Sequence, residues 1–144
     1  MVVQIGKDKK IYIKNDILNK MFSSIGMYHY ETGGILGTNV KGVITTFCFD
    51  KIQNPILHEY YPNTEYLNDI INKEWRKINV KFIGFVHSHL NNDKISEQDV
   101  IYSREILKYN RYLQNILIAI INLSNKQNNI KWYCVSKDTV IMVN

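Results

Sequence analysis

The sequence has few of the residues that mark disulfide-rich or low-complexity proteins. Its 144 residues include only two cysteines and two prolines. Cys48 and Cys134 stand far apart and form no C-x-x-C pair, so a disulfide framework is not expected. We predict two small buried thiols in a reduced, cytoplasmic protein. No repeat, linker or low-complexity segment is present, which favours one folded domain over residues 1–144.

Long apolar runs and concentrated charge are also missing. The longest apolar run, Ile116 to Ile121, is far shorter than the ~20 residues that span a bilayer. The start of the chain, Met1 to Lys10, lacks the apolar core of a signal peptide. The net charge is only +5, and the basic residues are scattered, with no stripe along one element. We therefore expect binding to neither membranes nor nucleic acids.

Apolar residues make up 45% of the chain, and their spacing predicts an α+β, or mixed α/β, domain of sheet and helices. Helical spacing predicts helices from Asp16 to about Met27, from Asn63 or Thr64 to Ile78, and from Ser96 to about Tyr109. Shorter apolar runs predict strands at Ile11–Ile13, Gly33–Gly37, Val43–Phe49, Phe82–Val86, Leu113–Leu123, Ile130–Val135 and Thr139–Val143.

Two histidines directly follow the apolar run Phe82 to Val86. His87 and His89 are two residues apart, so in a strand they project from the same face, with Cα atoms roughly 6.5–7 Å apart. Asp99 follows ten residues after His89. Two imidazoles and one carboxylate would give zinc three ligands and leave a fourth position open, as in catalytic sites. Histidines at a strand end are also often merely solvated, so the pair alone is weak evidence.

Ser96 and Asp99 have the spacing of a capping box, in which a serine side chain begins a helix and an acidic residue follows three positions later. This structural role is compatible with metal binding. A fixed helix terminus would hold Asp99 rigidly enough to act as a ligand.

His87-Ser88-His89, a short loop and Ser96-x-x-Asp99 together resemble the signature of the JAB1/MPN/Mov34 (JAMM) metalloenzymes. Glu31-Thr32-Gly33-Gly34 resembles the glutamate and glycine pair found upstream in that family. The resemblance implies a compact, prokaryotic-type MPN domain with a mostly antiparallel, curved sheet and about three helices. It also implies one zinc ion on His87, His89 and Asp99, Glu31 as general acid–base, and Ser96 as oxyanion donor.

The chain departs from the family pattern around the loop between His89 and Ser96. Leu90 and Ile95 stand where prolines are usual, and the loop has six residues where seven are usual. The shorter loop leaves Asp93 or Glu97 open as an alternative third ligand. We expect Leu90, Asn91, Asn92 and Ile95 to form one wall of a substrate channel.

The resemblance implies hydrolysis of a peptide or isopeptide bond after the C-terminal tail of a ubiquitin-like protein. Two alternatives remain: an inert MPN-type scaffold, and a metallohydrolase acting on small peptides or cell-wall fragments. The loop from Lys51 to Pro62 contains His58, Tyr60 and Tyr61, which either pack locally or line a substrate groove. His29 and His58 lack ligand-like spacing, so we expect structural or solvated side chains.

Overall fold

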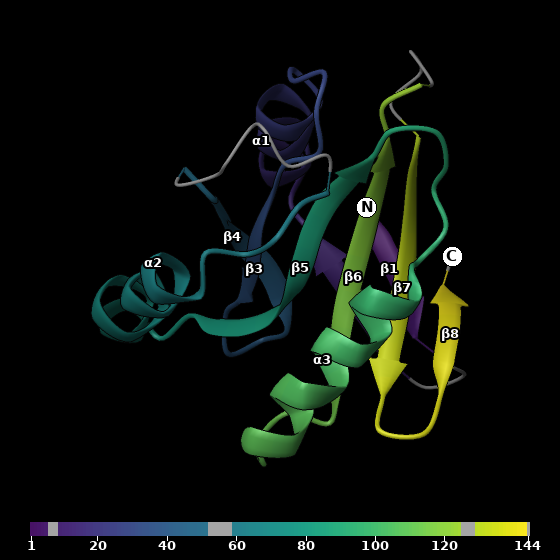
Figure 1. Cartoon of the computed structure of the whole chain (residues 1–144). Helices are drawn as coiled ribbons and strands as arrows, with labels where there is room; N and C mark the ends of the chain where they lie inside the picture. Colours follow the sequence, from purple (N-terminus) through teal and green to yellow (C-terminus); the bar gives the residue numbers. More distant parts are fainter. Residues whose placement is uncertain (6–8, 52–58, 125–128, 144) are drawn as a thin grey trace.

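The computed structural model describes residues 1–5, 9–51, 59–124 and 129–143, and Figure 1 shows the whole chain. Within these residues, eight strands form one curved sheet with the order β1-β2-β4-β3-β5-β6-β7-β8. The pairs β2–β4 and β5–β6 are parallel, and all other neighbouring pairs are antiparallel. The strands are β1 (Val2–Ile5), β2 (Lys9–Ile13), β3 (Gly33–Thr38), β4 (Val43–Phe49), β5 (Lys81–His89), β6 (Asn115–Asn122), β7 (Ile130–Ser136) and β8 (Val140–Val143).

Helices cover both faces of this sheet. Helix α1 (Asn15–Ile25) lies on one face, while α2 (Thr64–Asp69) and α3 (Glu97–Tyr109) lie on the other (Figure 1). Helix α2 continues directly into a π-helical segment, η1 (Ile70–Trp75), and a 3₁₀ turn, η2 (Arg76–Ile78). In the described part of the chain, no helix is long and apolar enough to cross a membrane.

Strand β6 shows why a continuous apolar run is needed here. Its side chains alternate between the two faces, and both faces are covered. One set joins the buried cluster beside α1, which we call the α1-side cluster; it includes Leu117, Ala119 and Ile121. The other set joins the cluster beneath α2 and α3, the α3-side cluster, which includes Ile116, Ile118 and Ile120. A polar side chain at any of these positions would be buried.

An irregularity in β5 sets the orientation of the strand that carries the histidines. Pairing with β3 shifts register between Leu36 and Gly37, so that Leu36 opposes Gly84 but Gly37 opposes Phe82. Because of this extra residue, Phe82 and Phe85 both belong to the α3-side cluster although they are three positions apart. Regular alternation then places His87 and His89 on the same face as Phe85.

Glycine at position 84 permits the close pairing of β5 with β6. A β-carbon there would collide with the carbonyl oxygen of Leu117 on the neighbouring strand. The parallel register places His87 beside Ile120 and His89 beside Asn122. The strand end that carries the histidines is therefore fixed against a central strand that is buried along most of its length.

Most predicted elements are present, with three differences. Strand β1 was not predicted; it pairs with β2 over four residue pairs. The second helix is not continuously α-helical, because η1 and η2 replace its C-terminal part. Strand β5 extends to His89, so both histidines lie within the strand. Both thiols are free, as predicted, but only Cys134 is buried; the predicted burial of Cys48 is wrong, because this side chain is half-buried.

Candidate metal centre

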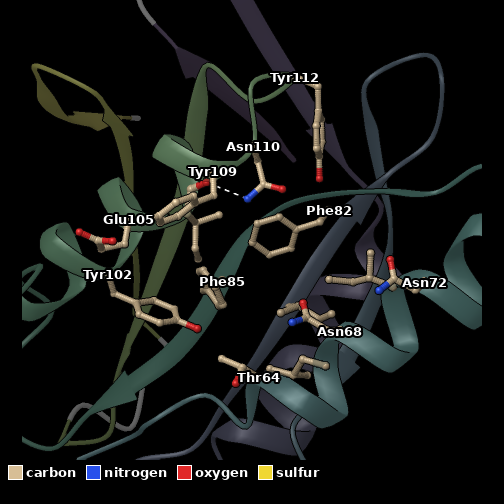
Figure 2. A pocket seen from close by; sticks show the side chains of 14 residues that line it. Thr64, Asn68, Asn72, Phe82, Phe85, Tyr102, Glu105, Tyr109, Asn110 and Tyr112 are labelled. Atoms are coloured by element: carbon tan, nitrogen blue, oxygen red, sulfur yellow. Dashed lines mark hydrogen bonds between the residues drawn. The ribbon is translucent and has the colours of Figure 1, made fainter.

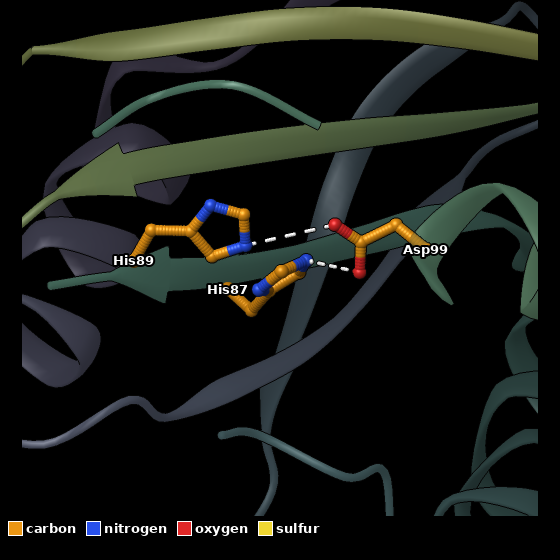
Figure 3. A group of neighbouring side chains, drawn as sticks. All are labelled: His87, His89 and Asp99. Atoms are coloured by element: carbon orange, nitrogen blue, oxygen red, sulfur yellow. Dashed lines mark ion pairs between the residues drawn. The ribbon is translucent and has the colours of Figure 1, made fainter. Parts of the chain in front are cut away.

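The end of β5 and the start of α3 bring His87, His89 and Asp99 together (Figure 3). Nε2 of His87 lies 2.9 Å from one carboxylate oxygen of Asp99, and Nε2 of His89 lies 3.6 Å from the other. One ligand atom from each residue lies within 4.8 Å of the other two. Because a tetrahedral zinc ion bonds its ligands at about 2.0–2.2 Å, donors so placed can bind one ion with little movement. The group is positioned to hold a metal ion.

The capping box at the start of α3 holds the carboxylate. The Asp99 backbone N–H donates to Ser96 Oγ at 3.0 Å, and the Ser96 backbone N–H donates to Asp99 Oδ2 at 3.0 Å. These reciprocal bonds confirm the predicted helix start. They also fix the carboxylate of Asp99 facing the two imidazoles. The predicted cap is therefore confirmed, and it coexists with the clustering of Asp99 beside the two histidines.

The two histidine rings differ in what holds them. Nδ1 of His89 lies 3.3 Å from Oδ1 of Asn92, an arrangement that orients the ring and directs Nε2 towards Asp99. His87 is only 6% exposed, and neither of its ring nitrogens has a hydrogen-bond partner of good geometry among the described residues. An unsatisfied buried nitrogen is costly. A metal ion bound at Nε2 would satisfy it, so these residues fit a metal.

His87, His89 and Asp99 interact electrostatically, and this interaction shifts the pKa values of Asp99 and His89. Burial alone would raise the pKa of the Asp99 carboxyl, but His87, His89 and the Ser96 backbone N–H outweigh it and hold that pKa well below its usual range. Burial acts to lower the pKa of His89, yet the adjacent Asp99 carboxylate and Asn92 raise it overall. The metal-free site thus favours an ionised Asp99, the form required for coordination.

Glu31 lies just before β3 and lines a hollow that His87, His89 and Asp99 also line. Burial raises the pKa of its carboxyl, and this effect exceeds the opposing influence of His89, of His87 and of hydrogen bonds from the backbone N–H groups of Tyr60 and Leu90. Glu31 is not one of the clustered ligand residues. It is therefore placed as a neighbour of the candidate metal and not as a ligand.

Ser88, which points away from the two histidines, ties the Glu31 segment to β5. The Thr32 backbone N–H donates to Ser88 Oγ at 3.0 Å, and the Ser88 N–H donates to the Thr32 carbonyl at 3.0 Å. Both residues are buried. The residue between the two histidines thus fixes the backbone next to Glu31, a role that sequence reasoning did not assign.

Tyr60 links the loop before α2 to the same centre. Its ring stacks on His87 with centroids 5.9 Å apart and an interplanar angle of 30°. Its hydroxyl donates to Oδ2 of Asp50 at 2.9 Å, and the Asn63 N–H donates to the same oxygen at 2.8 Å. Asp50 is fully buried. Sequence reasoning left Tyr60 open between local packing and a groove wall and missed Asp50, whose only signal was its place directly after β4.

The hollow at the centre has a volume of about 390 Å³. Leu90, Asn91 and Asn92 from the predicted channel wall line it, as does Ser96, whereas Ile95 packs against the α3-side cluster. The other members of its lining are Glu31, Glu59, Tyr60, Tyr61, His87, His89, Gln98 and Asp99.

The alternative third ligands, Asp93 and Glu97, are not part of the clustered group. The backbone carbonyl of Asp93 accepts a hydrogen bond from the Tyr133 hydroxyl at 2.8 Å, which holds the short loop against β7. Glu97 is exposed, as is His29, while His58 lies outside the described residues.

Solved structures with a similar fold include the following two. A solution structure of protein DSY2949 from Desulfitobacterium hafniense matches with a TM-score of 0.68 at 19% identity, covering 92% of this chain and 88% of that one. The crystal structure of AF2198, a JAB1/MPN domain protein from Archaeoglobus fulgidus, matches with a TM-score of 0.50 at 18% identity, covering 88% of each chain. No protein-family model and no curated protein sequence matches. At these identities the likeness concerns the fold alone, and the described residues have an MPN-like fold with a possible metal centre.

Proposed function

We propose that this protein is a zinc-dependent metallopeptidase or isopeptidase of the JAMM type. Its substrate would be a peptide or isopeptide bond after the C-terminal tail of a ubiquitin-like protein. The observation that carries the proposal is the cluster of His87, His89 and Asp99 in one hollow with Glu31. A purely structural metal site is closed by a fourth protein ligand, whereas among the described residues this group supplies three, and Glu31 lines the same hollow.

His87, His89 and Asp99 would hold the zinc ion. When bound, zinc acts as a Lewis acid that acidifies a water molecule and polarises the carbonyl to be attacked. Glu31 would accept the proton of that water and later deliver it to the leaving amine. A carboxyl whose pKa is raised towards neutral pH is better suited to both steps than an ordinary glutamate.

Ser96 would stabilise the negative charge that develops on the substrate oxygen. Its Oγ accepts the Asp99 N–H at 3.0 Å, which fixes the side chain and leaves the hydroxyl hydrogen to donate. In this proposal the Ser96 hydroxyl has two roles: its oxygen caps α3, and its hydrogen donates to the substrate oxygen.

A panel of linear fusions and isopeptide-linked substrates tests the proposal. We expect cleavage directly after a Gly-Gly end, dependence on zinc, and loss of cleavage with a chelator. Replacing Asn91 and Asn92 by proline should raise KM while zinc stays bound, because both residues line the hollow. Zinc binding without cleavage of any substrate would favour the inert scaffold. Cleavage confined to short peptides lacking such a tail would favour the small-peptide hydrolase.

A further inference from the structure

A second cavity, of about 490 Å³, lies between α2–η1 and α3, and we call it the inter-helix groove. Phe82 and Phe85 of β5 and Ile35 of β3 contribute to it from the sheet. Figure 2 shows amide side chains reaching towards it from α2–η1 and aromatic side chains reaching from α3. Phe82 and Phe85 belong to the packed α3-side cluster, so this part of the groove is preformed.

The inter-helix groove adjoins the metal centre, because the two are linked by shared lining residues. A smaller cavity of about 130 Å³ shares Phe85 and Tyr102 with the groove, and it shares Tyr60, His87 and Asp99 with the hollow. Five residue steps along β5 separate Phe82 from His87, which corresponds to about 17 Å. An extended peptide lying alongside β5 would cover that distance with about five residues.

The polar lining of the groove suits an uncharged polypeptide backbone. It consists mainly of neutral groups, among them Asn68, Asn72 and Asn110, and side-chain amides can both donate to and accept from a peptide. Asn68 and Asn72 are four residues apart, so they form a row along one wall. None of the lining residues is basic, which argues against a phosphate or carboxylate ligand.

Glu105 is the one charged residue among those that line the groove. It is exposed and has no ion-pair partner among the described residues. It follows Asp99 by six positions on α3, so it lies about 9 Å further along the helix. At ~3.3 Å per residue, this places it beside the third or fourth residue of an extended chain that ends at the metal centre.

We propose that the inter-helix groove binds the extended substrate segment that precedes the cleaved bond, and that Glu105 selects a lysine or arginine three or four residues before that bond. This inference rests on the proposed function, because that function supplies a tail ending at the metal. The groove provides neutral amides for the backbone and apolar surface for its side chains, while Glu105 provides the only charge preference.

A labelled peptide series tests the charge preference directly. Each of the six residues before the bond to be cleaved is replaced in turn by lysine, alanine or glutamate. Binding of each peptide to the Glu31→Gln variant protein is measured by fluorescence anisotropy. We expect a preference for lysine of about two- to fivefold, the size of one exposed ion pair, at the third or fourth position. Glu105→Lys should reverse it, whereas Glu74→Lys, at an exposed position outside the groove lining, should not. The same preference in Glu105→Lys would overturn the assignment.

A second pair of variants tests whether the groove is occupied at all. Asn68→Trp fills the groove from an exposed helix position, and we expect at least tenfold weaker peptide binding. Glu65→Trp changes the same helix outside the groove lining and should bind like wild type. Circular dichroism of both variants confirms folding. Equal binding by Asn68→Trp and wild type would refute the groove as the peptide site.

Failure of the groove and failure of the enzyme assignment give different results. Peptides that bind wild type but are never cleaved leave the groove intact and refute the hydrolase. Cleavage that Asn68→Trp and Glu105→Lys perform like wild type leaves the hydrolase intact and refutes the groove. A response to anionic or phosphorylated peptides stronger than to lysine peptides would also overturn the inference.

Discussion

The two faces of the sheet are built by the same strand alternation but serve different purposes. On one face, α1 places Ile17, Met21 and Ile25 against the strands, and each is at most 3% exposed. On the other face, α2–η1 and α3 stand apart and leave the inter-helix groove between them. The clustered histidines and Asp99 lie at the end of this second face. The face covered by α1 alone is closely packed, whereas the separation of α2–η1 from α3 leaves room for a binding site on the other face.

The position of the buried histidine follows the same division. The α1-side cluster consists of apolar residues and Cys134, whereas His87 is buried against the opposite face beside Phe85 and Tyr60. Buried polar groups reduce stability unless they are satisfied. We therefore expect substitutions on the α1 face to change stability first, and substitutions at the centre to change metal binding and chemistry first. The predictions below separate these effects.

The largest effect should follow removal of a ligand. His87→Ala should lose stoichiometric zinc and all detectable cleavage, because two donors remain where three are needed. Elemental analysis and cleavage assays measure both effects. His29→Ala, at an exposed position away from the cluster, is the control. Full zinc occupancy in His87→Ala would show that the ion binds elsewhere.

Glu31→Gln should separate chemistry from binding. It should keep one zinc per chain, because Glu31 is not a clustered ligand, yet lose roughly 10²–10⁴-fold in kcat. Metal analysis and single-turnover kinetics give the two values. Loss of the metal, or unchanged turnover, would remove Glu31 from its proposed role.

Met21→Ala tests the other face. Met21 is fully buried in the α1-side cluster, so its truncation should lower the free energy of unfolding by about 2–5 kcal/mol. Zinc content and kcat measured below the unfolding transition should stay near those of wild type. A large fall in kcat with full folding would show that the two faces are coupled.

Protonation of Asp99 should give the metal-free protein a pH-dependent stability. The folded-state pKa of this carboxyl is depressed below its unfolded value near 3.9, so its stabilisation is present above that value. It is lost as pH falls through the folded-state pKa. Denaturant unfolding of the metal-free protein should therefore show a loss of stability below about pH 4 that Asp99→Asn lacks. Equal acid dependence in both proteins would contradict this linkage.

The smallest effect should come from Tyr60→Phe. The substitution removes the hydrogen bond to Asp50 but keeps the ring that stacks on His87, so it should lower stability by about 1 kcal/mol. Denaturant unfolding measures this change. We expect zinc content to be retained. Tyr61→Phe, whose hydroxyl bonds only the exposed Glu59 among the described contacts, is the matched control and should change stability less.

Many of the correct predictions came from patterns among neighbouring residues. Alternation placed His87 and His89 on one face, and the capping box placed the start of α3. Strand β1 escaped prediction because four residues, Val2 to Ile5, are too short to show a clear period, and their pairing with β2 supplies the structure. The second helix was predicted as one element, although its apolar spacing does not distinguish α from π or 3₁₀ winding.

The features that depend on residues close together in the chain could be predicted from the sequence alone. The spacing of His87 and His89, the cap at Ser96 and the doubly buried strand β6 all follow from backbone periods of two or 3.6 residues. The folded structure was needed to show that Asp99, and not Asp93 or Glu97, faces the imidazoles. It was also needed to place Glu31 and the hydrogen-bonded pair of Asp50 and Tyr60 beside them. Those contacts join segments far apart in the chain, and their geometry depends on sheet register and loop path, which no local period specifies.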